Sequence, residues 1–250
     1  MIHHNLNIRE NLKEAYSDVY TSEALSVLSS LAHFNKDIKK VMASRLKRRT
    51  ECHQQKKRIT FLDPGSFIPR THITVQDARA GKFEGAVIPS DLQRQWIQGT
   101  GPAAKPDASV ENSIRNVAYA LLSGADGWMF DGEDALGQTK TMSLDNQRNL
   151  KLAIGKDPLF MKVAEQVAEG MNLWAIDFFG GPIVSNWEGQ LNFTTKIFRA
   201  RGLHLDDRHI RHVDGEAMAA SIVDMTLYVV NNYAALQKAG SSIVLYLPKI

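Results

Sequence analysis

Two apolar runs without polar alternation constrain the fold of this chain more than any other feature. They are 127-GWMF-130 and 242-SIVLYLPKI-250, and amphipathic helical patterns lie between them. A strand with one face in water alternates apolar and polar residues, so an unalternated strand is covered on both faces. Strands of this kind that are joined by helices form a parallel α/β sheet or barrel. The sequence therefore predicts an α/β fold.

Apolar residues at three- and four-residue spacing predict helices through most of the remaining sequence. A further strand is expected at 194–201, where an apolar run ends in charged residues. Residues 59–107 are rich in proline, glycine and aspartate, so we expect turns, one or two hairpins and a linker there. A loop is expected at 178–189. The predicted helices cover 22–49, 109–124, 143–154, 158–174 and 217–238.

Composition and charge are typical of a soluble globular protein. Hydrophobic residues make up 44% of the sequence and the formal net charge is only +3, so neither a nucleic acid nor an acidic membrane is required as a partner. The basic run 45-RLKRR-49, with 56-KKR-58, is interpreted as a solvated helix face because no aromatic residues interleave with it. A single cysteine, Cys52, and the lack of a membrane-spanning apolar run indicate a soluble cytoplasmic protein.

Polar side chains gather where three of the predicted strands end. The first strand ends in 131-DGED-134, the second in Arg199, Arg201 and His204, and the third in Lys249. Active sites of parallel α/β folds lie at the carboxyl ends of the strands. We therefore expect an anionic and a cationic group to share one pocket at this edge, with both arginines facing it.

Structural roles are the alternative for the same residues. At least one of Asp131, Glu133 and Asp134 is expected to cap the helix that follows. Arg201 has the alternative of pairing with one of these carboxylates and stiffening the rim. The histidines of 204–212 have the spacing H-x4-H-x2-H, but the stretch shows no helical or strand register that would bring their imidazoles together. No metal site is predicted there.

Two blocks of the sequence resemble the malate synthase family, in particular its shorter A-type form. The tail from 199-RARGLHL-205 to 246-YLPK-249 is similar to the family's block from RPRGWHL to YLPK. The segment 131-DGED-134 lies in a second block, similar to the one that carries the family's D-x-E-D. The resemblance runs from about residue 21 to the end of the chain, with a poor match near 155–192.

The resemblance implies a fold and a reaction. The fold is the first half of a TIM-type (β/α)8 barrel preceded by a helical N-terminal segment, with residues 1–80 as the segment and 81–250 as the barrel part. The reaction condenses acetyl-CoA with glyoxylate on Mg2+ to give malate and CoA, as in the glyoxylate cycle. Citrate-lyase β-type CoA lyases share the barrel and the D-x-E-D strand end, so a CoA lyase is the enzymatic alternative.

The resemblance also implies roles for single residues. Arg199 matches the first arginine of the family's RxRG motif, which contacts the enolate oxygen and glyoxylate, and is the expected catalytic residue. The D-x-E-D carboxylates are expected to support it from the pocket rim, and the remaining cations to bind substrate. The family's phenylalanine and tryptophan beside the site are Gly132 and Leu203 here, which is expected to widen or reshape the pocket. The supporting residues are Asp131, Glu133, Asp134, Arg201, His204 and Lys249.

Part of the family's site has no counterpart in these 250 residues. In the family, the two Mg2+ carboxylates and the catalytic aspartate follow the YLPK strand, and this sequence stops at Ile250. We therefore expect no metal ligand within the chain and little activity from the chain alone. Three hypotheses follow from this: part of a malate synthase completed by a second chain, half of a CoA lyase, or a non-catalytic remnant that binds CoA or assembles with a partner.

Overall fold

A computed structural model describes residues 5–58, 60–99, 105–132 and 138–248. The chain divides into two compact units, Met1–Lys39 with Ser90–Ile250, and Lys40–Pro89. Each unit is compact in its own contacts. The sequence boundary at residue 80, between a helical segment and the barrel part, stays a prediction.

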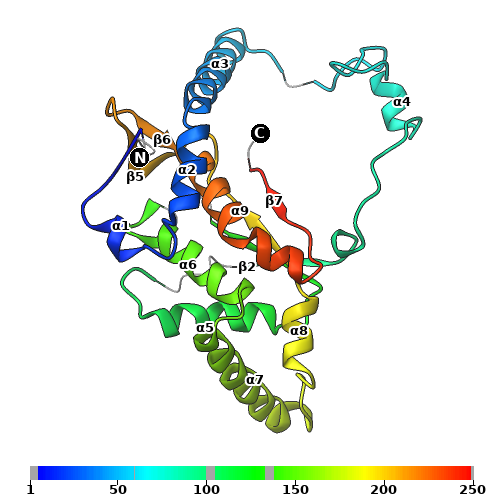
Figure 1. The fold of residues 1–250 in the computed structure, drawn as a ribbon. Helices are drawn as coiled ribbons and strands as arrows, with labels where there is room; N and C mark the ends of the chain where they lie inside the picture. Colours follow the sequence, from blue (N-terminus) through cyan, green and yellow to red (C-terminus); the bar gives the residue numbers. More distant parts are fainter. Residues whose placement is uncertain (1–4, 59, 100–104, 133–137, 249–250) are drawn as a thin grey trace. The chain divides into compact units, whose positions relative to one another are not determined.

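A four-stranded parallel sheet forms the centre of the larger unit. It consists of β2 (Trp96–Gly99), β3 (Gly127–Asp131), β4 (Thr195–Arg199) and β7 (Val244–Tyr246), in that order across the sheet (Figure 1). Parallel neighbours in sequence order, joined by helices, are the arrangement of part of a (β/α)8 barrel, which confirms the predicted fold class.

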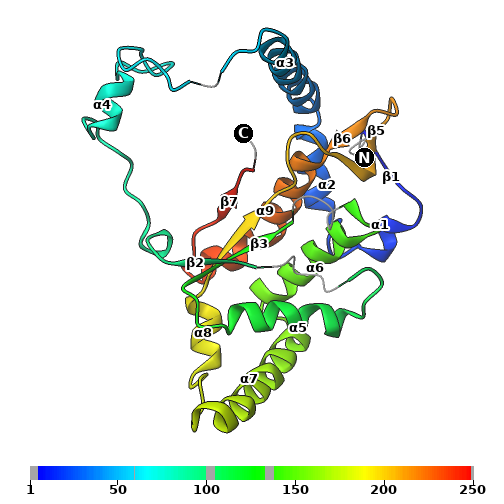
Figure 2. The ribbon, with the colours of Figure 1, turned by 180° about the vertical axis from the view of Figure 1, so that it is seen from behind.

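Strand β2 lies in the segment that was expected to hold only turns, hairpins and a linker, so that prediction was wrong here. It pairs with β3 from Trp96 opposite Gly127 to Gly99 opposite Phe130 (Figure 2). Most of its residues are exposed because it is one of the two edge strands of the described sheet. It therefore lacks the continuous apolar run that identifies the inner strands.

Helices connect the parallel strands. Three of them lie close to the predicted positions: α5 (Val110–Leu121), α6 (Met142–Ile154) and α9 (Ala220–Lys238). None of the helices within the described residues combines the length and apolar character needed to cross a lipid bilayer.

Two further helices, α7 (Pro158–Phe179) and α8 (Trp187–Phe193), fill the segment that matched the family poorly. The predicted end of α7 at residue 174 was too early, because the stop signal is Gly180, which adopts φ 77°. The predicted loop at 178–189 is also shorter, since the Asn186 side chain accepts a hydrogen bond from the Gly189 N–H and starts α8.

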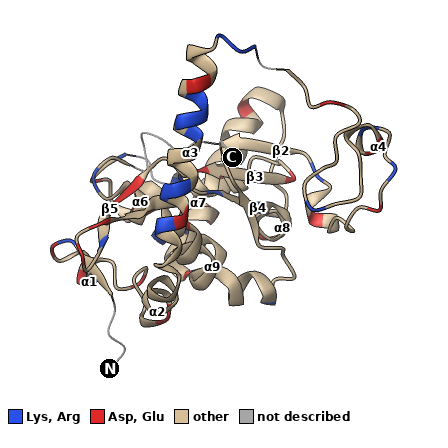
Figure 3. Ribbon diagram, turned by 90° about the horizontal axis from the view of Figure 1, so that it is seen from above, with Lys and Arg blue, Asp and Glu red and all other residues tan. Residues whose placement is uncertain are grey.

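The single helix predicted at 22–49 is two helices, α2 (Ser22–Leu31) and α3 (Phe34–Gln54). The apolar stripe that suggested one helix is buried only in its first part. Leu25 and Leu28 are buried, whereas Val41 and Leu46 are 50% and 57% exposed. Lysine and arginine residues follow one another along α3 (Figure 3). The smaller unit also holds α4 (Val75–Arg79), and a short 3-10 turn, η1 (Ser90–Leu92), starts the next part of the larger unit.

An antiparallel sheet that the sequence did not reveal packs with α2 in the larger unit. Its order is β1 (Leu6–Ile8), β5 (Asp206–His212) and β6 (Ala217–Ala219). The stretch with the histidines therefore does have a strand register. The short helix α1 (Leu12–Ala15) follows β1.

Two hydrophobic cores hold the larger unit together. In the first, Trp128, Phe130, Phe198 and Tyr228 form an aromatic group in which the Phe198 and Tyr228 rings stack with centroids 4.7 Å apart. Side chains of α5, α6, α7 and α9 complete this core against one face of the parallel sheet. The second core joins the N-terminal helices to α9, β5 and β6.

Three buried charges connect β4, β5 and α9. The Arg201 side chain is 1% exposed; its Nη2 lies 2.7 Å from Asp224 Oδ1 and 2.6 Å from Asp207 Oδ2. Its Nε and its backbone N–H both donate to Asp224 Oδ2 at 2.9 Å. Burial alone would lower the pKa of Arg201, but the two carboxylates outweigh it and raise that pKa. The two carboxylates therefore favour the charged form of the guanidinium.

Lys196, within β4, is a second buried cation. It is 9% exposed, and its Nζ donates to the Leu191 carbonyl. Burial, followed by the positive charges of Lys156 and Arg94, lowers the pKa of Lys196 to about 8. The folded chain therefore favours the neutral amine more than the unfolded chain does.

Removing one carboxylate of the Arg201 group tests its contribution to stability. Asp224→Ala leaves a buried guanidinium with less compensation, so we expect a loss of about 3–5 kcal/mol in the free energy of unfolding. Urea denaturation measures this loss. Asp18→Ala is the control, because the Arg148–Asp18 pair is 20% and 42% exposed and should cost about 1 kcal/mol or less. Equal losses in the two variants would contradict the assigned role.

Replacing Lys196 tests the cost of its burial. Because its folded pKa of about 8 lies below the ordinary 10.5, the unfolded state binds more protons between these values, and stability should rise with pH across that window. Lys196→Met should stabilise the chain at neutral pH by roughly 1–3 kcal/mol and abolish the rise. Urea denaturation at a series of pH values measures both effects. Lys162→Met, at an exposed position, should leave the rise intact; persistence of the rise in Lys196→Met would refute the assignment.

Candidate functional site

Four side chains converge at the carboxyl end of the parallel sheet. Arg199 Nη1 lies 2.7 Å from Asp131 Oδ2, and Gln98 Nε2 donates to the same oxygen at 3.1 Å. On the other side, the guanidinium carbon of Arg199 lies 5.6 Å from the centre of the Tyr246 ring. Each of the four strands contributes one member, and we call this group the edge cluster.

Strand register explains why the edge cluster forms. Asp131 is directly opposite Arg199, and Arg199 is directly opposite Tyr246, so the three side chains project from the same face of the sheet. The neighbouring residues Phe130 and Phe198 project from the opposite face into the aromatic core. The aromatic core therefore holds the strands in place, and the pleat directs the side chains of the edge cluster to the opposite face of the sheet.

The edge cluster is partly buried, which strengthens the ion pair between Arg199 and Asp131. The side chains of Arg199 and Asp131 are 17% and 25% exposed. An ion pair shielded from water interacts more strongly than one on an open surface. A guanidinium held in one plane by a carboxylate is a preorganised donor for a second anion, in particular a carboxylate or an oxyanion.

The structure separates the two arginines that were expected to share a pocket. Arg199 joins the edge cluster, whereas Arg201 is almost completely buried between Asp207 and Asp224. We therefore correct the expectation that both face one pocket. Asp207 and Asp224, which hold Arg201, lie in β5 and α9. The alternative pairing of Arg201 with a DGED carboxylate involves Glu133 and Asp134, which lie outside the described residues, so it stays a prediction.

The other expected site residues lie outside the edge cluster or outside the described part of the chain. His204 is exposed in the turn that follows β4 and is not part of the edge cluster. Glu133, Asp134 and Lys249 lie outside the described residues, so their roles stay predictions.

Among the residues that the structure describes, no three histidine, cysteine, aspartate or glutamate side chains gather in a way that could hold a metal ion. His209 is buried, and burial lowers the pKa of its imidazole. His212 is half-buried, and its Nδ1 lies 3.1 Å from Asp214. Although β5 provides a strand register, it does not bring the histidines together.

Sequence reasoning missed Gln98, Tyr246 and the two carboxylates that hold Arg201. Asp224 had a visible signal, because it is a single charge within the apolar stretch 222-IVDMTLYVV-230 of a helix. An acidic residue inside such a stretch indicates a buried partner. Gln98 and Tyr246 had no comparable signal, since their positions depend on strand register.

Gly132 brings the segment after β3 close to β4. A Cβ atom at this position would lie 2.9 Å from the Arg199 carbonyl oxygen and 3.3 Å from the Phe198 ring. The Gly132 N–H donates to that carbonyl at 3.1 Å. The space beside the Gly132 Cα is already filled by β4. The presence of glycine here therefore does not widen the pocket at this point, contrary to the expectation.

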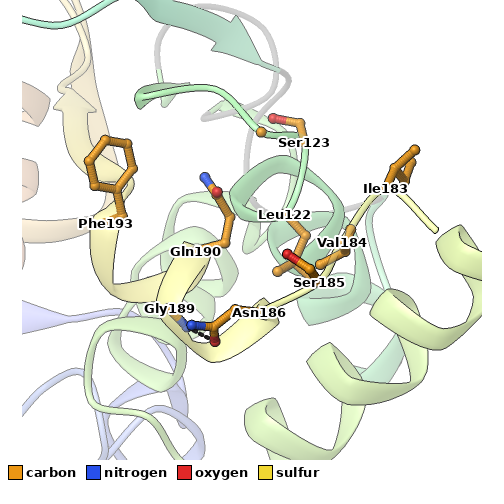
Figure 4. Close-up of a pocket in the computed structure, with 10 residues that line it drawn as sticks. Leu122, Ser123, Ile183, Val184, Ser185, Asn186, Gly189, Gln190 and Phe193 are labelled. Atoms are coloured by element: carbon orange, nitrogen blue, oxygen red, sulfur yellow. Dashed lines mark hydrogen bonds between the residues drawn. The ribbon is translucent and has the colours of Figure 1, made fainter.

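Two cavities elsewhere are weaker candidates. One of about 290 Å³ lies beside α8, at the amino end of the sheet, and no charged residue lines it (Figure 4). A second, of about 500 Å³, is lined by Arg9, Lys140 and Arg208. Each of these three cations already contacts an acceptor on the protein. The edge cluster is therefore the candidate functional site.

Comparisons with known proteins find similarity to malate synthases. The malate synthase TIM barrel domain matches residues 195–250, which include Arg199 and Tyr246. The chain is 29% identical over 237 residues to malate synthase A of Escherichia coli, 28% over 235 residues to malate synthase of Myxococcus xanthus, and 25% over 249 residues to glyoxysomal malate synthase of Ricinus communis.

These matches cover most of the chain but a minority of each relative. They include 94% of the chain for the E. coli and M. xanthus proteins and 98% for the R. communis protein. The chain spans only 37%, 36% and 37% of the three relatives, in the same order. Over the part of their length that it spans, the chain is therefore similar to malate synthases.

Proposed function

We propose that this chain supplies part of a malate synthase active site, which condenses acetyl-CoA with glyoxylate to give malate and free CoA. The observation that supports the proposal is the edge cluster: Arg199, at the position of the family's first RxRG arginine, lies at the carboxyl end of the sheet and is held by Asp131. The relatives that the chain matches carry the name malate synthase. A cytoplasmic location is part of the proposal and is supported by the single cysteine.

The chemistry requires a positive charge where the edge cluster provides one. A carboxylate base removes a proton from the acetyl methyl group, and the electron pair moves onto the thioester oxygen. That methyl group is a very weak acid, so the enolate forms only if its oxygen is stabilised. A guanidinium fixed before the reaction stabilises the oxyanion without reorganisation. Arg199 would fill this role.

The remaining steps join the two carbon skeletons and release CoA. The enolate carbon attacks the aldehyde carbon of glyoxylate, which forms the new C–C bond of malyl-CoA. Water then adds to the thioester carbonyl, and CoA leaves as the free thiol. Arg199 is suited to orient glyoxylate, because its planar fork pairs with a carboxylate. Asp131 would act as a positioning residue that keeps this fork in place.

Mg2+ is also part of the proposal, but the described residues do not by themselves form a site for it. Bound Mg2+ would polarise the glyoxylate aldehyde and clamp its carboxylate. Its ligands and the base are proposed to come from the part of the family's sequence that this chain does not span, either in the same polypeptide or in a second chain.

The first test follows free thiol when the purified chain is mixed with acetyl-CoA, glyoxylate and Mg2+. We expect little or no release, because the chain spans 37% of its relatives and the described residues hold no metal group. Release that depends on both substrates would show that these residues suffice. In a parallel assay with malyl-CoA as substrate, cleavage to acetyl-CoA and glyoxylate without release of free thiol would favour a CoA lyase. Binding of CoA without either reaction would favour a non-catalytic remnant.

The second test places Arg199 in a complete enzyme. In an active chimera, this chain replaces the matching segment of the E. coli relative. There Arg199→Lys should lower kcat/KM for glyoxylate-dependent thiol release by about 100-fold or more, since lysine cannot present a planar fork. Arg211→Lys, an exposed arginine on β5, is the matched control and should retain full activity. Near-normal turnover of the Arg199→Lys chimera would remove this residue from the mechanism.

A further inference from the structure

The cavity of about 500 Å³ in the larger unit is lined by cations from three separate segments of the chain. Arg9 follows β1, Lys140 precedes α6, and Arg208 lies in β5. Among the described residues that line the cavity, the one carboxylate is Glu10. We call this cavity the basic pocket. Its volume is in the range of pockets that bind small molecules.

A buried histidine without a side-chain partner forms part of the pocket wall. His209 is 5% exposed, and neither of its ring nitrogens makes a hydrogen bond of normal geometry. Its main chain, by contrast, is held on both sides. The His209 N–H donates to Asp207 Oδ1 at 2.8 Å, and its carbonyl accepts the Arg9 N–H at 2.8 Å. An unpaired buried polar group costs free energy, so a ligand that pairs with this ring is expected.

The environment of His209 suits an oxyanion. Burial lowers the pKa of the imidazole, and the Asp207 carboxylate and the Lys140 backbone offset only part of this effect. The ring is therefore neutral near pH 7, with one nitrogen that donates and one that accepts. Its N–H can donate to an anionic oxygen while the surrounding cations balance the charge.

The three cations are not committed to their present partners. Arg9 pairs with Glu10, and Lys140 pairs with Asp107, through side chains that are all more than half exposed. Arg208 is exposed and donates to a backbone carbonyl. Exposed ion pairs of this kind contribute little to stability. A doubly charged anion in the pocket can therefore replace the carboxylates.

The start of α6 adds hydroxyl groups and the positive end of a helix. Thr139 and Thr141 line the pocket immediately before this 13-residue helix. Helix N-termini carry a partial positive charge and commonly bind phosphate groups. Asp145, the acidic residue of the first turn, is not among the described lining residues, and its carboxylate accepts the Tyr16 O–H at 2.6 Å.

We propose that the basic pocket binds the phosphate group of a small phosphate monoester. Cations from separate segments can surround a tetrahedral dianion, whereas a flat carboxylate is suited to one bidentate partner. Leu12, which also lines the pocket, offers an apolar contact to the carbon part of the ligand. None of the described lining residues belongs to the edge cluster, so the proposal stands whether or not the chain supplies a malate synthase site.

Isothermal titration calorimetry of the full 250-residue chain with glycerol phosphate at low ionic strength tests the proposal. The wild-type chain should bind, and Arg208→Gln and His209→Gln should each raise the Kd by about tenfold or more, since each removes a hydrogen bond to a charged group. Arg211→Gln removes the same charge from the same strand but from outside the described pocket lining, so it should leave the Kd unchanged. Because Arg208 is exposed, its variant should fold normally.

Several outcomes would overturn the phosphate site. These are a wild-type chain that does not bind, equal weakening in Arg208→Gln and Arg211→Gln, and succinate bound as tightly as glycerol phosphate. Loss of binding in the chimera with the E. coli relative would also overturn it, because another part of the complete protein would then fill the pocket.

Free CoA as a second titrant identifies the source of the phosphate. Binding of CoA that is tighter than that of glycerol phosphate and is weakened in Arg208→Gln would support the site and assign it to the phosphates of CoA. Weaker binding of CoA than of glycerol phosphate would support the site and assign it to a separate phosphorylated molecule.

Discussion

The buried group of Arg201, Asp207 and Asp224 is the interaction on which the rest of the larger unit depends. Its guanidinium is held by two carboxylates from different elements, and one of these also accepts the backbone N–H of Arg201. The other carboxylate accepts the N–H groups of His209 and Ile210 at the start of the small sheet. One cation thus fixes the chain leaving β4, the course of β5 and the position of α9.

This arrangement also gives two nearby arginines opposite tasks. The charge of Arg201 is balanced inside the protein by Asp207 and Asp224, and these ion pairs hold β5 and α9 to the chain that leaves β4. Arg199, two residues earlier, is anchored on one side by Asp131 and remains at the edge where the barrel strands end. The buried Arg201 group holds the end of β4 rigidly. This support makes Arg199 a well-placed donor, because preorganisation requires a rigid support.

The sequence predicted the inner strands and most helices because these elements bury continuous or periodic apolar residues. It could not predict β2, whose side chains face solvent at the sheet edge, or the small sheet, whose first strand lies far from the other two in the sequence. Within the site, Asp131 and Arg199 were predicted because both follow apolar runs. Gln98 and Tyr246 joined them through strand register, which depends on the complete sheet. Arg201 was misplaced because its partners lie in a strand and a helix that periodicity does not link to it.

The antiparallel pairing of β1 with β5 has a consequence for how the chain is made. Leu6 lies opposite His212, so the partner of the first strand is synthesised roughly 200 residues later. At ribosomal rates of about 5–20 residues per second, the N-terminal segment waits roughly 10–40 s for that partner. During this interval its apolar residues, among them Leu12, Tyr16 and Val19, have no α9 to pack against. The segment that holds β1 is thus synthesised before β5 and α9 but completes its packing only after both have emerged.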